Sequence, residues 1–369
     1  MNILITGSEG FVGRNLREFL RQERPHDELL CYDIGSVPES LASYCRDADF
    51  VFHLAGVNRP TDDSEFESGN KSLTETVLSH CREGKKPPVL LSSSVQALLD
   101  NPYGKSKKAS EDAAFAYESE TGSSAYVFRL PGVFGKWCRP NYNSVVATFC
   151  HNIANDLQIE VRDASFELNL IYIDDVCRTF ISALNGHAQK NGGFCVAAPT
   201  HSITLGALAD TLRSFRHSRE NLHVPNLSDP LTRKLHSTYL SYLPDFSYPL
   251  TANNDERGSF TEFLKTPDRG QTSINVAKPS VTKGNHWHHT KTEKFLVVSG
   301  QGIVRFRKVG DSEIKEYPVS GDEHKVVDIP PGYIHSITNT GQSDLVTIMW
   351  ADEIFDPNTS DTHAEAIDS

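Results

Sequence analysis

The chain has 369 residues, which is long for a single domain and predicts two. Hydrophobic residues make up 38% and charged residues 23%, so the chain can build apolar cores and a disordered protein is excluded. The formal net charge of -12 disfavours nucleic acid as a partner, because most of such a surface repels phosphate backbones.

No apolar run approaches the roughly 20 residues of a membrane span, and no basic leader precedes the first glycine cluster. Seven cysteines without a C-x-x-C pair argue against a disulfide framework. We therefore expect a cytoplasmic protein with no membrane contact.

Strand-like and helix-like segments alternate through the first part of the chain. Segments 72–81 and 105–118 have helical spacing. The apolar runs between helices are Ile3–Ile5, Leu29–Tyr32, Phe50–Phe52, Val89–Leu91 and Ala125–Phe128. This rhythm predicts an α/β fold with a doubly wound parallel sheet of the Rossmann type.

From about residue 247 the pattern changes to short β-rich runs broken by glycine and proline. Such runs predict an antiparallel sandwich or small barrel. The expected strands are Lys294–Val298, Gly302–Phe306, Lys325–Ile329 and Leu345–Met349. We expect an α/β domain at 1–246 and an all-β domain at 247–369, with a loose acidic segment from Asp356 onward.

A glycine-rich turn follows the first predicted strand and opens the first helix. Gly7 permits a tight turn, Gly10 lets the backbone approach a pyrophosphate, and Gly13 lets the helix pack closely on the strand. The turn, with Phe11 and Val12, is expected to hold the phosphates of a dinucleotide at the helix N-terminus. A plain turn is the alternative, but the strand–turn–helix order favours the dinucleotide.

Asp33 ends the second predicted strand, about 20 residues after the last glycine. An acid in that position binds the ribose hydroxyls of the adenosine and repels a 2′-phosphate, which favours NAD(H) over NADP(H). The alternative is a solvated loop aspartate.

Tyr103 and Lys107 are four residues apart in a predicted helix, so they share a face. A nearby ammonium and a cationic nicotinamide would favour the phenolate, which would let Tyr103 exchange a proton near neutral pH. Ser94 ends the fourth predicted strand, where its hydroxyl would hydrogen-bond a substrate carbonyl.

Residues 1–245 resemble the extended short-chain dehydrogenase/reductase family. Besides the glycine turn and Y-x-x-x-K, the landmarks are His53–Gly56, Arg129–Gly135 and Tyr172–Val176. The resemblance implies a nicotinamide cofactor with Ser94, Tyr103 and Lys107 as the catalytic trio. It also places five residues at the cofactor: Leu54, Ala55, Gly56, Pro131 and Val133.

Nucleotide sugars are common substrates in that branch of the family. By position alone, Lys136, Asn141 and Asn143 would then lie near the nucleotide diphosphate. Ordinary loop residues are the alternative.

Histidines are enriched after position 285. His286 and His288 alternate along a predicted strand and so share a face, and His335 follows another strand and turn. Three imidazoles and a carboxylate suit Zn, Fe, Mn or Ni without singling out one metal. These segments resemble both signature motifs of the cupin superfamily, which implies a divalent metal. The implied ligands are His286, His288, Glu293 and His335.

A further segment, Asp255–Phe263, resembles the D-x-R-G-x-F-x-E motif of the cupin-fold sugar-nucleotide 3,5-epimerases. This resemblance implies that Arg257 and Glu262 hold the phosphate and sugar of the substrate. Those enzymes place a catalytic histidine where His286 stands and need no metal. His286 is therefore a general base, a metal ligand or both.

Over nearly its full length the chain resembles the CapF family of bifunctional capsular-polysaccharide enzymes. The segments that carry this likeness are His53–Pro60, Lys136–Cys138, Asn141–Val145 and Lys283–Thr290. The resemblance implies a homodimer whose cupin domain, with zinc bound, epimerises C3 of a 4-keto-6-deoxy UDP-N-acetylhexosamine. Its reductase domain would then reduce C4 with NADPH. The product would be UDP-2-acetamido-2,6-dideoxy-L-talose, a precursor of UDP-N-acetyl-L-fucosamine for capsule or O-antigen synthesis. Relatives carry a basic stretch where this chain has Tyr32-Asp33-Ile-Gly, so NADH stays open beside NADPH.

Two other functions remain to be weighed. The chain could be a nucleotide-sugar reductase or 4-epimerase whose cupin serves only for dimerisation or substrate binding, and the converging ligand set argues against that. It could also be a redox-sensing regulator that binds a dinucleotide without turnover, which the intact Ser94, Tyr103 and Lys107 disfavour.

Overall fold

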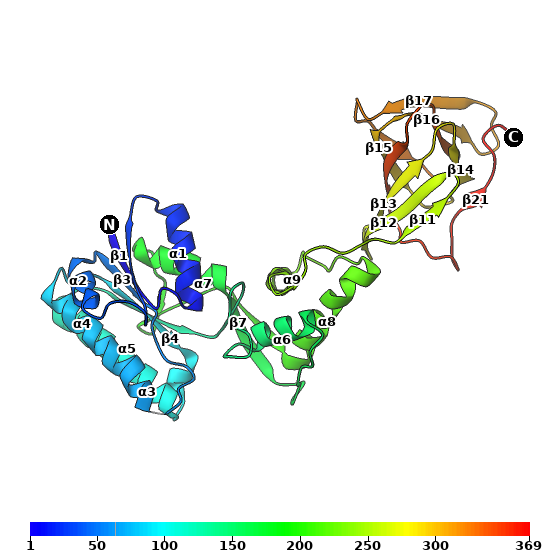
Figure 1. Cartoon of the computed structure of the whole chain (residues 1–369). Helices are drawn as coiled ribbons and strands as arrows, with labels where there is room; N and C mark the ends of the chain where they lie inside the picture. Colours follow the sequence, from blue (N-terminus) through cyan, green and yellow to red (C-terminus); the bar gives the residue numbers. More distant parts are fainter. Residues whose placement is uncertain (63) are drawn as a thin grey trace. The chain divides into compact units, whose positions relative to one another are not determined.

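The computed structural model describes residues 1–62 and 64–369, which form two compact units (Figure 1). One unit comprises Met1–Arg213 with Ser228–Pro244, and the other comprises Ser214–Leu227 with Asp245–Ser369. The functional division at 246/247 stays a prediction. The compact units differ from it chiefly in Ser214–Leu227, a segment that includes the end of helix α8 (Leu205–Asn221).

A seven-stranded sheet forms the centre of the first unit, in the order β2-β1-β3-β4-β5-β9-β8. All pairings from β2 to β9 are parallel, and β8 pairs antiparallel with β9 at one edge. The strand order reverses between β1 and β3, which is where open parallel sheets bind ligands beyond their carboxyl ends. The strands are β1 Asn2–Thr6, β2 Glu28–Tyr32, β3 Phe50–His53, β4 Val89–Ser94, β5 Ala125–Leu130, β8 Lys190–Asn191 and β9 Phe194–Cys195.

Helices cover both faces of this sheet, which explains why its strands read as continuous apolar runs. Ile5 of β1 belongs to a buried cluster with Leu16 of α1 and Phe180 of α7, whereas Leu4 packs in a second cluster with Val77 of α4 and Tyr117 of α5. The helical segments are α1 Phe11–Glu23, α2 Ser40–Asp47, α3 Ser64–Phe66, η1 Glu67–Ser72, α4 Leu73–Glu83, η2 Val95–Leu98, α5 Pro102–Thr121, α6 Val145–Ala154, α7 Ile173–Leu184, α8 and α9 Pro230–Leu240. The doubly wound Rossmann-type fold is confirmed.

A three-stranded sheet, in the order β10-β7-β6, completes the first unit. Its strands are β6 Gly132–Phe134, β7 Glu167–Tyr172 and β10 Thr200–Thr204. Among the described residues, no helix combines the length and the apolar character needed to cross a membrane.

Two antiparallel sheets make up most of the second unit, in the orders β11-β12-β13-β20-β15-β18 and β17-β16-β19-β14-β21. Inward-facing side chains of both sheets, such as Phe295 of β15 and Phe306 of β16, share one apolar core. The strands are β11 Ala252–Asp255, β12 Gly258–Thr266, β13 Gly270–Ala277, β14 Thr282–Trp287, β15 Glu293–Ser299, β16 Gln301–Lys308, β17 Ile314–Ser320, β18 Val326–Ile329, β19 Tyr333–Asn339, β20 Leu345–Ala351 and β21 His363–Ala364. The all-β fold and its four expected strands are confirmed.

The expectation of a loose segment from Asp356 is wrong from Asp361 onward. Strand β21 pairs with β14, and Ile367 is 3% exposed. The buried guanidinium of Arg307 donates hydrogen bonds to the carbonyls of Ala366 and Ile367. The acidic composition suggested a solvated tail. The segment is instead held by β14 and by Arg307 of β16, which are distant in sequence, so its own composition does not reveal these contacts.

Candidate active sites

The glycine turn has the close contacts that its spacing predicts. Gly7 adopts a φ of 71°, and a Cβ there would lie 2.7 Å from the backbone nitrogen of Ala55. A Cβ on Gly13 would lie 2.1 Å from the carbonyl oxygen of Gly7, so only glycine lets α1 pack against the turn. Phe11 and Val12 form the first turn of α1, directly after Gly10. The loop is therefore shaped for a ligand at the start of α1.

Asp33 lies against this turn. Its carboxylate accepts a hydrogen bond from the backbone N–H of Glu9 (2.7 Å) and another from that of Ile34 (2.8 Å). These contacts fix a negative charge beside the glycine turn, where the adenosine ribose of a dinucleotide would lie.

The residues that follow β3 and β5 lie at the carboxyl ends of these strands, as the glycine turn does for β1. The backbone N–H groups of Leu54 and Ala55 donate to the carbonyl and hydroxyl of Thr6, at the end of β1. Gly56 approaches Lys107 closely, since a Cβ there would lie 3.1 Å from Nζ. Pro131 follows β5, and Val133 lies in β6 and packs against the main core of this unit.

The structure brings Ser94, Tyr103 and Lys107 together. Tyr103 lies near both other residues: the Ser94 hydroxyl acts on the pKa of the phenol, and Lys107 Nζ lies 6.0 Å from the centroid of the Tyr103 ring. Lys107 is buried and donates to the carbonyl of Ser92 (3.1 Å). This arrangement places a hydroxyl pair and a buried cation on the carboxyl end of β4 and the start of α5.

Burial is the largest influence on the pKa values of Tyr103 and Lys107. It raises the pKa of Tyr103, against a smaller lowering by the nearby Ser94 hydroxyl. The expected lowering involves a bound nicotinamide and stays a prediction. Burial also lowers the pKa of Lys107 to about 8, although the carboxylate of Glu111 opposes that change. Tyr103 is thus held protonated at neutral pH, the form needed to donate a proton.

The sequence analysis missed two buried polar residues near the trio, Glu111 and Asn70, because neither belongs to a recognisable motif. Glu111 is fully buried, accepts a hydrogen bond from the Ser93 hydroxyl (2.6 Å), and forms a two-pronged ion pair with Arg129 (2.6 and 2.8 Å). Asn70 donates to the hydroxyl of Ser106 (2.9 Å) and accepts from the N–H of Val57. Both fix α5, which carries Tyr103 and Lys107.

The three loop residues expected at a nucleotide diphosphate do not form one group. Lys136 pairs with Asp174 at 2.5 Å. Asn141 and Asn143 are exposed in the following loop, and the backbone N–H of Asn141 donates to the Thr148 hydroxyl. Their role in substrate binding stays a prediction.

Four side chains of the second unit converge on one point. One potential ligand atom from each of His286, His288, Glu293 and His335 lies within 4.8 Å of the others. The Glu293 carboxylate is 3.3 Å from Nε2 of His335 and 3.6 Å from Nε2 of His288. A backbone bulge in β14 between Gly284 and His286 brings His286 beside His335 of β19, with ring centroids 4.5 Å apart.

The hydrogen bonds of His288 and His335 leave one nitrogen of each ring available to bind a metal. Nδ1–H of His288 donates to the carbonyl of Asp361 (2.5 Å), and Nδ1–H of His335 donates to that of Tyr333 (3.3 Å). Both Nε2 atoms are buried without a hydrogen-bond partner. Two lone pairs that face a carboxylate need a cation between them, so the donor set suits a divalent metal.

A cavity of about 490 Å³ opens beside this cluster. His286 and Glu293 line it together with Glu262 and two lysines, Lys283 and Lys291. Arg257 does not line it; it lies in the β11–β12 turn and pairs with Asp255 (2.6 Å). Burial and the neighbouring His335 lower the pKa of His286 to about 4, so in the metal-free chain this imidazole is neutral at neutral pH.

Comparison with known proteins shows the family to which this chain belongs. Residues 3–197 match the NAD dependent epimerase/dehydratase family, and residues 253–363 match the polysaccharide biosynthesis C-terminal domain. The crystal structure of the capsular polysaccharide assembling protein CapF from Staphylococcus aureus is 51% identical, with a TM-score of 0.94, over 99% of this chain and 100% of that one. The chain belongs to the CapF family.

Two further proteins are similar to this chain. A UDP-2-acetamido-2,6-beta-L-arabino-hexul-4-ose reductase from Pseudomonas aeruginosa is 45% identical over 367 residues, which is 99% of this chain and 98% of that protein. A UDP-glucuronic acid 4-epimerase from Bacillus cereus, solved with NAD, is 17% identical over 66% of this chain and 98% of its own; its TM-score of 0.55 shows a shared fold. This CapF-family chain is a nicotinamide-dependent enzyme of the nucleotide-sugar reductase and epimerase type, from polysaccharide biosynthesis.

The position of Asp33 yields a prediction about cofactor choice. We expect this CapF-family chain to reduce its substrate with both NADH and NADPH, and Asp33→Asn to shift the ratio of kcat/KM about tenfold toward NADPH. The reason is that the substitution removes a charge that repels a 2′-phosphate, an effect of about 1.4 kcal/mol. Steady-state rates with each cofactor measure the ratio, and Asp47→Asn, on α2, is the control for charge. Strict NADPH dependence of the unaltered chain would show that Asp33 does not meet the ribose.

Proposed function

We propose that the second unit epimerises C3 of a 4-keto-6-deoxy UDP-N-acetylhexosamine, and that the first unit then reduces C4 with NADH or NADPH. The product is UDP-2-acetamido-2,6-dideoxy-L-talose, a precursor of UDP-N-acetyl-L-fucosamine for capsule or O-antigen synthesis. The name of the Pseudomonas aeruginosa relative supports this substrate class, because a hexul-4-ose carries a ketone at C4.

One observation carries the proposal for the second unit: the cavity beside the histidine cluster. A module used only for dimerisation or substrate holding needs no converging set of three imidazoles and a carboxylate. Here a neutral imidazole, a carboxylate and two lysines meet at a space large enough for a sugar.

Carbonyl chemistry sets the order of the two reactions. The hydrogen on C3 is acidic only while C4 is a ketone, because the resulting enolate places its charge on the C4 oxygen. Reduction to the alcohol removes that acidity and locks the new configuration. Epimerisation must therefore precede reduction.

In the second unit, His286 would remove the C3 proton as a neutral base, or bind the metal, or both, and a proton from water or from a lysine of the cavity wall would return to the opposite face of C3. A divalent metal, with zinc the first choice, would be held by His286, His288, Glu293 and His335 and would supply positive charge for the enolate oxygen. Lys283 and Lys291 add further positive charge to the cavity wall. Glu262 lines the same cavity and is available to a sugar hydroxyl.

In the first unit, the bound nicotinamide would supply the hydride to C4. Ser94 hydrogen-bonds the C4 oxygen and Tyr103 donates a proton to it, since burial holds this phenol in its protonated form. Lys107, fixed by the Ser92 carbonyl, places an ammonium group beside Tyr103. The glycine turn and Asp33 hold the far end of the cofactor.

The test is a product analysis by NMR with the full chain and the 4-keto-6-deoxy UDP-N-acetylhexosamine. In deuterated water without nicotinamide, we expect deuterium to enter at C3. With reduced cofactor, we expect the C4 alcohol with inverted C3. If no deuterium enters at C3 while reduction proceeds, the alternative holds: a nucleotide-sugar reductase whose second unit serves only for binding or dimerisation.

A further inference from the structure

A segment distant in sequence from the histidine cluster closes around it. Asp361–Ile367, here called the C-terminal strap, contains β21, which pairs with β14 in the register His286↔Ala364. The N–H of Glu365 donates to the carbonyl of Asn285 (3.0 Å). The strap thus runs alongside the strand that carries His286.

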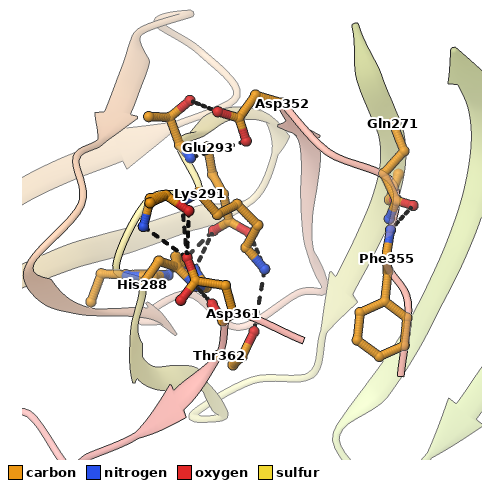
Figure 2. Close-up of polar contacts among 12 residues, drawn as sticks. Gln271, His288, Lys291, Glu293, Asp352, Phe355, Asp361 and Thr362 are labelled. Carbon is orange, nitrogen blue, oxygen red and sulfur yellow. Dashed lines mark hydrogen bonds and ion pairs between the residues drawn. The ribbon is translucent and has the colours of Figure 1, made fainter. Parts of the chain in front are cut away.

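The carboxylate of Asp361 organises the loop between two of the candidate ligands. It accepts three backbone N–H bonds, from His289 (2.9 Å), Thr290 (2.8 Å) and Lys291 (3.1 Å), and one from the Thr290 hydroxyl (3.1 Å). Figure 2 shows this carboxylate surrounded by its donors. These residues join His288 to Glu293, so one side chain fixes the turn that separates the two ligands.

The backbone of Asp361 acts on a ligand directly. Its carbonyl accepts the Nδ1–H bond of His288, which fixes the proton on Nδ1 and leaves the Nε2 lone pair facing the cluster. The next residue, Thr362, accepts a hydrogen bond from Lys291 Nζ (3.3 Å), and that ammonium lies 3.8 Å from the Glu293 carboxylate. One dipeptide of the strap therefore contacts both the ligand loop and a lysine of the cavity.

The far end of the strap is anchored independently. The Arg307 guanidinium, 7% exposed, donates to the carbonyls of Ala366 and Ile367 and pairs with the Glu365 carboxylate (3.1 Å). An arginine buried in β16 to hold backbone carbonyls shows that the strap is a fixed part of the second unit.

We propose that Asp361 is a positioning residue for the metal centre, and that the strap holds His288 and the 289–291 turn in the metal-binding arrangement. This inference rests on the proposed metal site. A partner that orients a histidine ligand typically contributes 10–100-fold to metal affinity. Without the Asp361 carboxylate, the three N–H groups lose their common acceptor. The loop is then held only by the bond from His288 to the carbonyl of residue 361 and by Thr292, which donates to Asp352, so the position of His288 relative to Glu293 is less well fixed.

The test is Co²⁺ binding by the metal-free full chain, followed by the visible absorption of the bound ion and by competition with a chelator. We expect Asp361→Ala to weaken Co²⁺ binding by about 10–100-fold and to alter the spectrum, because the ligand geometry changes. Asp361→Asn keeps one acceptor oxygen and is expected to lie between the two. Asp344→Ala, which removes a pair with Lys278 elsewhere in the second unit, is the matched control.

Each result bears on a different claim. Thermal unfolding of the metal-free proteins shows whether Asp361→Ala folds, and if it does not, Asp361→Asn decides the question. Affinity and spectrum equal to those of Asp344→Ala would overturn the strap's role, even if the unfolding temperature fell. Failure of the unaltered chain to bind Co²⁺ would overturn the metal site and the strap's role with it, while leaving a metal-free epimerase intact.

Discussion

Replacing Tyr103 by phenylalanine is expected to lower kcat for reduction by about 10²–10⁴-fold, the range for loss of a positioned proton donor. The substitution removes the phenol hydroxyl, which lies near Ser94, and keeps the ring that packs against Phe66. Oxidation of NADH or NADPH by the 4-keto substrate measures the effect.

The same variant should retain the first reaction. Deuterium exchange at C3 is expected to be unchanged, because Tyr103 belongs to the first unit and the exchange is assigned to the second. Tyr44→Phe, which also removes one phenol from the first unit, serves as the control. Full reductase activity in Tyr103→Phe would remove Tyr103 as the proton donor.

His286→Asn is expected to give the reverse pattern. C3 exchange should fall by about 10²–10⁴-fold, since His286 lines the cavity as the proposed base or ligand. Reduction of a substrate already inverted at C3 should persist. His324→Asn is the matched control, because His324 is exposed in the segment between β17 and β18.

Metal content then separates the two roles of His286. A variant that keeps its metal and loses exchange identifies a base, whereas one that also loses metal, as His288→Asn should, identifies a ligand. Undiminished exchange in His286→Asn would contradict both roles and with them the assignment of epimerisation to this cavity.

Much of the fold was predictable because its signals are local. Alternating apolar runs and helical spacing gave the parallel sheet, since strands buried on both faces read as continuous hydrophobic segments. The glycine turn was equally predictable from the sequence, because the close contacts at Gly7 and Gly13 leave no room for a larger residue. The pairing of Tyr103 with Lys107 follows from helical geometry alone.

The four residues of the histidine cluster were predicted partly from their spacing and partly from a family resemblance. His286 and His288 are neighbours in sequence, and the cupin-like motifs added Glu293 and His335. The structure brings all four together through the pairing of β14 with β19 and a bulge that turns His286 inward. Whether His286 serves as base or ligand is a matter of chemistry that the sequence left open.

What the sequence by itself determined is therefore the order of elements and the residue types that each site requires. Only the tertiary structure decided how Asp33 meets the glycine turn, how Glu111 and Arg129 support the catalytic helix, and how Asp361 reaches His288. It also showed that burial raises the pKa of Tyr103 in the chain alone. Such contacts join residues far apart in the chain, and they depend on sheet register and burial, which local patterns do not encode.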